Sequence, residues 1–172
     1  MRKILEIGCV VLLGALFLIT VRAVYGPHPL PVRIPTHFDI VGNPDAWSSR
    51  STLEILPFVA LLLYLFLTMV ARSNSLIRFP DQVTPEKQEL LEAMVDGLIS
   101  WIKTEVVGIL LCVAWTMIHV ARQQDQSSLL GLWMLIAAVF LTIAFYAIAM
   151  TLVWRSSPEP TDSDEVAAPP PD

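Results

Sequence analysis

The chain has 172 residues, of which 55% are apolar and only 16% are charged, and this composition excludes an ordinary soluble domain. Its net charge of −5 comes from the acidic residues that follow Ser156, because the acidic and basic residues before that point balance one another. With no basic face to attract phosphates, the sequence argues against a nucleic-acid partner.

Four apolar segments are long enough to cross a bilayer as helices, which takes about 20 residues each. They run approximately from Ile4 to Val24, from Leu53 to Ala71, from Leu98 to Val120 and from Leu129 to Trp154. We expect the first to be retained rather than cleaved as a signal peptide, because Arg22 stands where small residues should precede a cut. The predicted fold class is an all-α, polytopic membrane protein with four transmembrane helices and one structured extracytoplasmic loop, embedded in a lipid bilayer.

The orientation follows from the lysines and arginines of the short connections, which are enriched on the cytoplasmic side of membrane proteins. With the N-terminus inside, the cytoplasmic side carries more of these residues than the outer side. The sequence therefore predicts a multi-pass protein with N-in and C-in topology, in which residues 1–71 form a two-helix membrane domain with an outer loop at 25–52.

The outer loop is the most informative part of the chain. Its early prolines favour extended backbone, and Thr36 to Val41 has the alternation of a short strand. Gly42-Asn43-Pro44-Asp45 is typical of a tight turn. Ser51 or Thr52 is then a plausible N-cap for the second helix, with Glu54 in its first turn.

The same loop holds the candidate functional side chains. His37 and Asp39 would share a strand face, and Asp45 or His28 could complete a metal site with them, although zinc usually takes three or four ligands in a fixed geometry. A catalytic role for the pair lacks an evident nucleophile. The remaining interpretations are hydrogen bonds to the loop's own backbone and recognition of a partner. The candidate recognition and loop-structuring residues are Pro35, His37, Phe38, Asp39, Gly42, Pro44, Asp45, Trp47 and Arg50.

The rest of the chain divides into three parts. Residues 72–97 are predicted to be a cytoplasmic loop with an amphipathic helix, in which Thr84 is the N-cap and Pro85 the first helical residue. This helix either bends at Gly97 or continues through it into the third span. Residues 98–155 carry the third and fourth transmembrane helices. Residues 156–172 are rich in proline and acids, which predicts a disordered tail.

Few ionisable or reactive groups fall inside the predicted spans. Glu6, Lys103 and Glu105 lie within one or two turns of the span ends, and Lys103 could either pair with Glu6 or extend to the head groups. Cys9 and Cys112 lie in apolar runs and are expected to be small buried hydrophobes.

The string LPVRIPTHFDIVGNPDAWSSRS at residues 30–51 resembles the bacterial membrane domain of unknown function found at the N-terminus of the sporulation-delaying-toxin immunity proteins. Arg50 stands where that family commonly has lysine, and the resemblance covers about Leu12 to Met69. The matching positions are Pro31, Ile34, Pro35, His37, Phe38, Gly42, Pro44, Asp45, Trp47 and Ser49. The resemblance implies a location in the bacterial cytoplasmic (inner) membrane.

We therefore expect a non-enzymatic membrane protein for recognition or signalling, similar to the immunity family and without a cofactor. The outer loop would bind an extracytoplasmic peptide or protein ligand, and the loop at 72–97 or the tail would contact a cytoplasmic protein partner. Two alternatives are a small transport or permeation component and a metal-dependent activity at the outer face.

Overall fold

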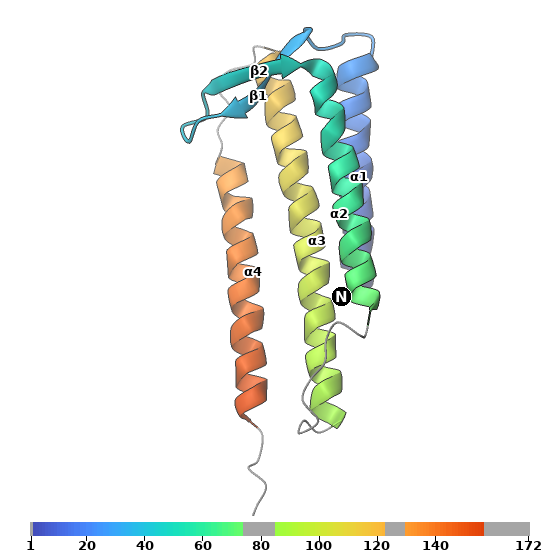
Figure 1. Cartoon of the computed structure of the whole chain (residues 1–172), viewed down its shortest axis with the longest axis vertical. Helices are drawn as coiled ribbons and strands as arrows, with labels where there is room; N and C mark the ends of the chain where they lie inside the picture. Colours follow the sequence, from blue (N-terminus) through green and yellow to red (C-terminus); the bar gives the residue numbers. More distant parts are fainter. Residues whose placement is uncertain (1, 74–84, 123–129, 157–172) are drawn as a thin grey trace, which may run out of the picture.

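The computed structural model describes residues 2–73, 85–122 and 130–156, which form four long helices with a β-hairpin across one end (Figure 1). The predicted tail after Ser156 and the predicted cap Thr84 lie outside the described residues. In chain order the elements are α1 (Arg2–Tyr25), β1 (Arg33–Phe38), β2 (Pro44–Ser49), the 3₁₀ helix η1 (Arg50–Glu54), α2 (Ile55–Arg72), α3 (Pro85–Ala121) and α4 (Leu130–Arg155).

All four helices are long and apolar enough to cross a membrane. A helix satisfies its backbone hydrogen bonds internally, which is what a segment in hydrocarbon requires. The predicted all-α, polytopic fold with four spans is thereby confirmed, and the chain is a multi-pass membrane protein.

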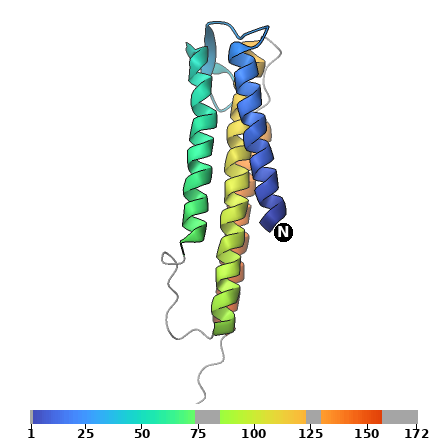
Figure 2. The ribbon, with the colours of Figure 1, turned by 90° about the vertical axis from the view of Figure 1, so that its right-hand side faces the viewer.

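Helix α3 is the centre of the bundle. Helices α1, α2 and α4 all pack against it. Helices α1 and α2 also pack against each other, whereas the main neighbour of α4 is α3. At 1.5 Å per residue its 37 residues are about 55 Å long, and it extends well beyond the start of α1 (Figure 2). It begins at Pro85 and carries Glu86 in its first turn, as predicted.

Helix α3 runs through Gly97 without a break, so the amphipathic segment and the third span are one helix. The reason for a glycine here is contact with α4. A Cβ atom at Gly97 would lie 2.6 Å from the hydroxyl oxygen of Tyr146, which is closer than van der Waals packing permits. Gly97 therefore lets the Tyr146 side chain approach α3 closely.

The best-packed region lies at the hairpin end of the bundle. There the loop after α1 contributes Leu30, β1 contributes Ile34 and η1 contributes Leu53, and all three are almost fully buried. They pack against α1 and α3 through Leu16, Ala23, Val24, Ala114, Met117, Ile118 and Ala121. Burial of this apolar surface fixes the hairpin to the helices.

The sequence predicted one strand and a turn in this loop, whereas the structure has two paired strands. The first strand is Arg33–Phe38 rather than 36–41, and it pairs antiparallel with Pro44–Ser49, with irregular register around His37. Pro35 is tolerated because each strand of a two-stranded sheet has an open edge. Ser49 caps η1, because its side chain accepts a hydrogen bond from the Ser51 N–H. Helix α2 begins at Ile55 with Glu54 at its N-cap position and no side-chain cap, so the prediction of Ser51 or Thr52 as its N-cap, with Glu54 in its first turn, is wrong.

Candidate functional site

The hairpin turn is organised by Asp39. Its Oδ1 atom accepts hydrogen bonds from the backbone N–H groups of Asn43 at 2.8 Å and Val41 at 2.9 Å, and its Oδ2 atom accepts one from Asn43 Nδ2 at 3.1 Å. The Asn43 backbone N–H, followed by the Asn43 side chain, holds the pKa of Asp39 below its ordinary value. Gly42 completes the turn at a φ of 100°, which side-chain-bearing residues rarely adopt.

His37 is paired with Asp45 across the hairpin, and not with Asp39. The distance from His37 Nδ1 to Asp45 Oδ1 is 2.5 Å, and both side chains are exposed. The carboxylate of Asp39 already accepts the hydrogen bonds of the turn. Across residues 2–73, 85–122 and 130–156, no group of three or more His, Cys, Asp or Glu side chains is placed to hold a metal ion. What the hairpin presents to solvent is therefore an imidazole–carboxylate pair with unused hydrogen-bonding capacity.

Arg50 ties the two ends of the loop together. Its Nη1 atom donates to the carbonyl oxygen of Leu30 at 3.0 Å, and its backbone N–H donates to the carbonyl oxygen of Val32 at 3.0 Å. The hydroxyl of Tyr25, at the end of α1, donates to Glu54 Oε1 at 2.9 Å. These contacts join the entry and the exit of the loop, so its shape is set before any partner binds.

A pocket of 310 Å³ lies between the hairpin and the helix ends. Residues 36–40 form one wall, with Thr36, His37 and Asp39 as polar members. Helices α3 and α4 form the other wall. The apolar lining consists of Phe38, Ile40, Val113, Leu132, Trp133 and Ile136. The sequence indicated His37, Phe38 and Asp39 as candidate residues but not the pocket, because no local pattern shows that α3 and α4 end beside the hairpin.

The other predicted loop residues divide into buried and exposed sets. Pro35 is buried within β1, and Phe38 packs partly against the core opposite Pro44. Trp47 lies opposite Pro35 in the sheet and remains half exposed. Ile40 and Val41, on the turn between the two strands, also have exposed apolar side chains. Pro35 thus shapes the loop, whereas Trp47 faces outward.

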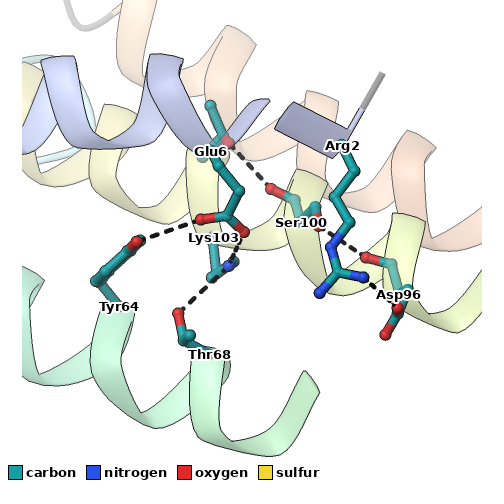
Figure 3. A network of polar contacts seen from close by, with 8 residues as sticks. Arg2, Glu6, Tyr64, Thr68, Asp96, Ser100 and Lys103 are labelled. Atoms are coloured by element: carbon teal, nitrogen blue, oxygen red, sulfur yellow. Dashed lines mark hydrogen bonds and ion pairs between the residues drawn. The ribbon is translucent and has the colours of Figure 1, made fainter. Parts of the chain in front are cut away.

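A second polar cluster joins three helices near the Arg2 end of the bundle (Figure 3). The ammonium group of Lys103 on α3 forms an ion pair with Glu6 on α1 and donates to Thr68 Oγ1 on α2 at 3.3 Å. The hydroxyl of Tyr64 donates to Glu6 Oε2 at 3.2 Å, and its ring centroid lies 5.2 Å from Lys103 Nζ. Of the two alternatives for Lys103, the structure shows the pairing with Glu6 and not an extension of its side chain to the head groups.

Two further polar contacts tie α3 to its neighbours. Arg2 Nη1 lies 2.7 Å from Asp96 Oδ2, at the point where α1 begins (Figure 3). Thr142 on α4 donates to Glu105 Oε1 at 2.6 Å. The sequence indicated Glu105 but gave no sign of Thr142 or of the Arg2–Asp96 pair, because such partners are far apart along the chain.

These observations define a class: a multi-pass membrane protein whose β-hairpin is anchored on a four-helix bundle. A family model described as "Domain of unknown function (DUF1648)" matches residues 11–61, which cover most of α1, the hairpin, η1 and the first turns of α2. No curated protein and no solved structure matches the chain.

Proposed function

We propose that this chain is a non-enzymatic recognition protein of the bacterial inner membrane, with both ends of the described chain inside and the hairpin outside. The hairpin binds an extracytoplasmic peptide or protein. The observation that carries the proposal is the 310 Å³ pocket between the hairpin and the ends of α3 and α4. An apolar pocket with a few polar groups at its wall is the usual form of a binding site.

The surroundings of the pocket support recognition. The hairpin is held by Asp39, Arg50 and the core beneath it, so little conformational entropy is lost when a partner binds. Trp47 offers the kind of aromatic anchor found at interface hot spots. The exposed His37–Asp45 pair supplies directional hydrogen bonds. The site thus combines an apolar pocket with polar groups that can select a ligand by hydrogen bonding.

The ligand that suits this site is a membrane-active peptide with an apolar side chain. The pocket opens beside the ends of two spans, where such a peptide would concentrate at the bilayer surface. The resemblance to the immunity proteins supports the same assignment, in which the protein binds a secreted toxic peptide. The part of α3 that extends past the start of α1 would contact the cytoplasmic protein partner.

The test is selection of displayed peptides on the protein in lipid nanodiscs, followed by Kd measurements on variants. Ile136→Trp fills the pocket from α4, and Ile143→Trp is the matched control on the same helix, seven residues away and outside the lining. Loss of one buried apolar anchor corresponds to about 1.5–3 kcal/mol, so Ile136→Trp should weaken binding by about tenfold or more.

His37→Ala, Asp45→Ala and Trp47→Ala should also weaken binding of the selected peptide at an unchanged protein level. Equal affinity for wild type and Ile136→Trp, or no enrichment over empty nanodiscs, would contradict the proposal. Growth of a toxin-sensitive host that expresses the chain, challenged with the peptide, then shows whether binding confers protection.

A further inference from the structure

The side of the bundle between α1 and α4 contains two adjoining hollows. One is a groove of 700 Å³ along α3, and α1 and α4 form its sides. Its surface is almost entirely apolar, although Thr104 and Glu105 are among the lining residues. The other is a pocket of 400 Å³ at the Arg2 end, lined in part by Arg2, Asp96 and Tyr146. Trp101 belongs to both, so the polar pocket and the apolar groove share a wall.

The groove has the length and position of a lipid chain. On α3 it runs from Trp101 to Trp115, a distance of about 21 Å at 1.5 Å per residue. One leaflet contributes half of a hydrocarbon core of about 30 Å, so the groove covers more than the depth of one leaflet. Gly108 lies midway along this stretch, and because it has no side chain it leaves room in the groove.

The pocket at the Arg2 end carries two opposite charges. Arg2 and Asp96 form an ion pair at 2.7 Å, yet their side chains remain 56% and 33% exposed. A guanidinium group has five N–H donors and matches phosphate geometry, and a carboxylate accepts hydrogen bonds from an ammonium group. A phosphate and a primary ammonium group occur together in the head groups of aminophospholipids, of which phosphoethanolamine is the simplest.

We propose that this composite site binds a phospholipid with a primary ammonium group, such as phosphatidylethanolamine. Arg2 contacts its phosphate, Asp96 accepts hydrogen bonds from its ammonium group, and one acyl chain lies in the groove over Gly108. Trp101 is at the level where the head group joins the chains, which is the depth that tryptophan favours in membranes. The site is distinct from the hairpin pocket and does not depend on the proposed function.

The test is lipid competition on the full chain. The protein is equilibrated with equal amounts of dioleoyl phosphatidylethanolamine, phosphatidylcholine and phosphatidylglycerol, and retained lipids are counted by native mass spectrometry. Wild type should retain phosphatidylethanolamine over phosphatidylcholine by about tenfold, because a trimethylated ammonium has no N–H to donate to Asp96. Asp96→Asn should remove this preference, whereas Glu92→Gln, one turn away on α3, should keep it.

The groove is tested separately with glycine variants. A Cβ atom at Gly108 would meet only Leu135 at 3.9 Å, so Gly108→Leu adds bulk to the groove without a backbone clash. It should reduce retained phosphatidylethanolamine by about tenfold, whereas Gly14→Leu, in open space on α1, should not. Equal retention of phosphatidylethanolamine and phosphatidylcholine by wild type, a preference for phosphatidylglycerol, or full retention by a helical Gly108→Leu protein would overturn the proposal.

Discussion

At the scale of single residues, the two members of the Lys103–Glu6 ion pair are buried to different extents. The side chain of Lys103 is 2% exposed, whereas that of Glu6 is 30% exposed. A buried charge is tolerated only when it is paired, and removing its partner leaves an uncompensated charge. The unequal burial therefore predicts unequal consequences for substitution of the two residues.

Glu6→Ala should destabilise the bundle more than Lys103→Met. The first leaves the ammonium group of Lys103 buried, with Thr68 and the Tyr64 ring as contacts among the described residues, at a cost of about 3–5 kcal/mol. The second leaves the carboxylate of Glu6 near the surface with the Tyr64 hydroxyl as its donor. Thermal unfolding in detergent micelles measures both.

The double variant Glu6→Ala/Lys103→Met provides the control, because it removes both charges. It should be more stable than Glu6→Ala alone. If the two single variants melted at the same temperature and the double variant lost the sum of both effects, the ion pair would not act as a unit.

Asp39 makes the hairpin turn sensitive to acid. Its pKa is lowered in the folded state, so the ionised form stabilises the turn. This stabilisation is complete above the pKa of an unfolded aspartate, about 3.9, and is lost as the pH falls through the lowered value. Hydrogen exchange of the Val41 and Asn43 amides should therefore quicken below about pH 4 in wild type, beyond the intrinsic pH dependence of exchange. In Asp39→Asn exchange should be faster at neutral pH and show no such additional change.

At the scale of elements, the hairpin depends on the backbone of Gly42. A residue with a Cβ atom at its φ of 100° is strained, so Gly42→Ala should destabilise the hairpin by about 1–2 kcal/mol. Gly14→Ala is the control, because a Cβ there meets nothing within 4 Å in a regular helix. Faster amide exchange in β1 and β2 for the first variant alone is the expected result. Unchanged hairpin exchange in Gly42→Ala would show that the turn has room for a side chain.

The elements differ in how far the sequence predicts them. The four spans follow from hydropathy, since each apolar run matches the thickness of a bilayer. Strand β2 was missed because proline, aspartate and serine rarely favour strands; its pairing comes from the turn and from the core beneath β1. The hairpin pocket is not predicted by the sequence. His37, Phe38 and Asp39 are candidate residues from the loop, but the helical wall comes from residues more than 70 positions away along the chain.

At the scale of the whole molecule, the proposed orientation can be tested with single cysteines. In a Cys9→Ala/Cys112→Ala background, Val41→Cys on the exposed turn should react with a membrane-impermeant maleimide on intact cells. Ser156→Cys, after the end of α4, should react only after permeabilisation. The reverse pattern would place the hairpin in the cytoplasm and contradict the proposed extracytoplasmic ligand.

The length of α3 has a mechanical consequence. The helix is clamped at Lys103 by α1 and α2, and it ends beneath the hairpin at Ala121 and at the opposite extreme at Pro85. Lys103 is 18 residues from either end, so about 27 Å of helix lies on each side of it. The half that ends at Ala121 is packed against α1 and the hairpin, so it is not free to tilt. Because the helix is continuous, a shift of α3 along its axis would displace its two ends by the same distance.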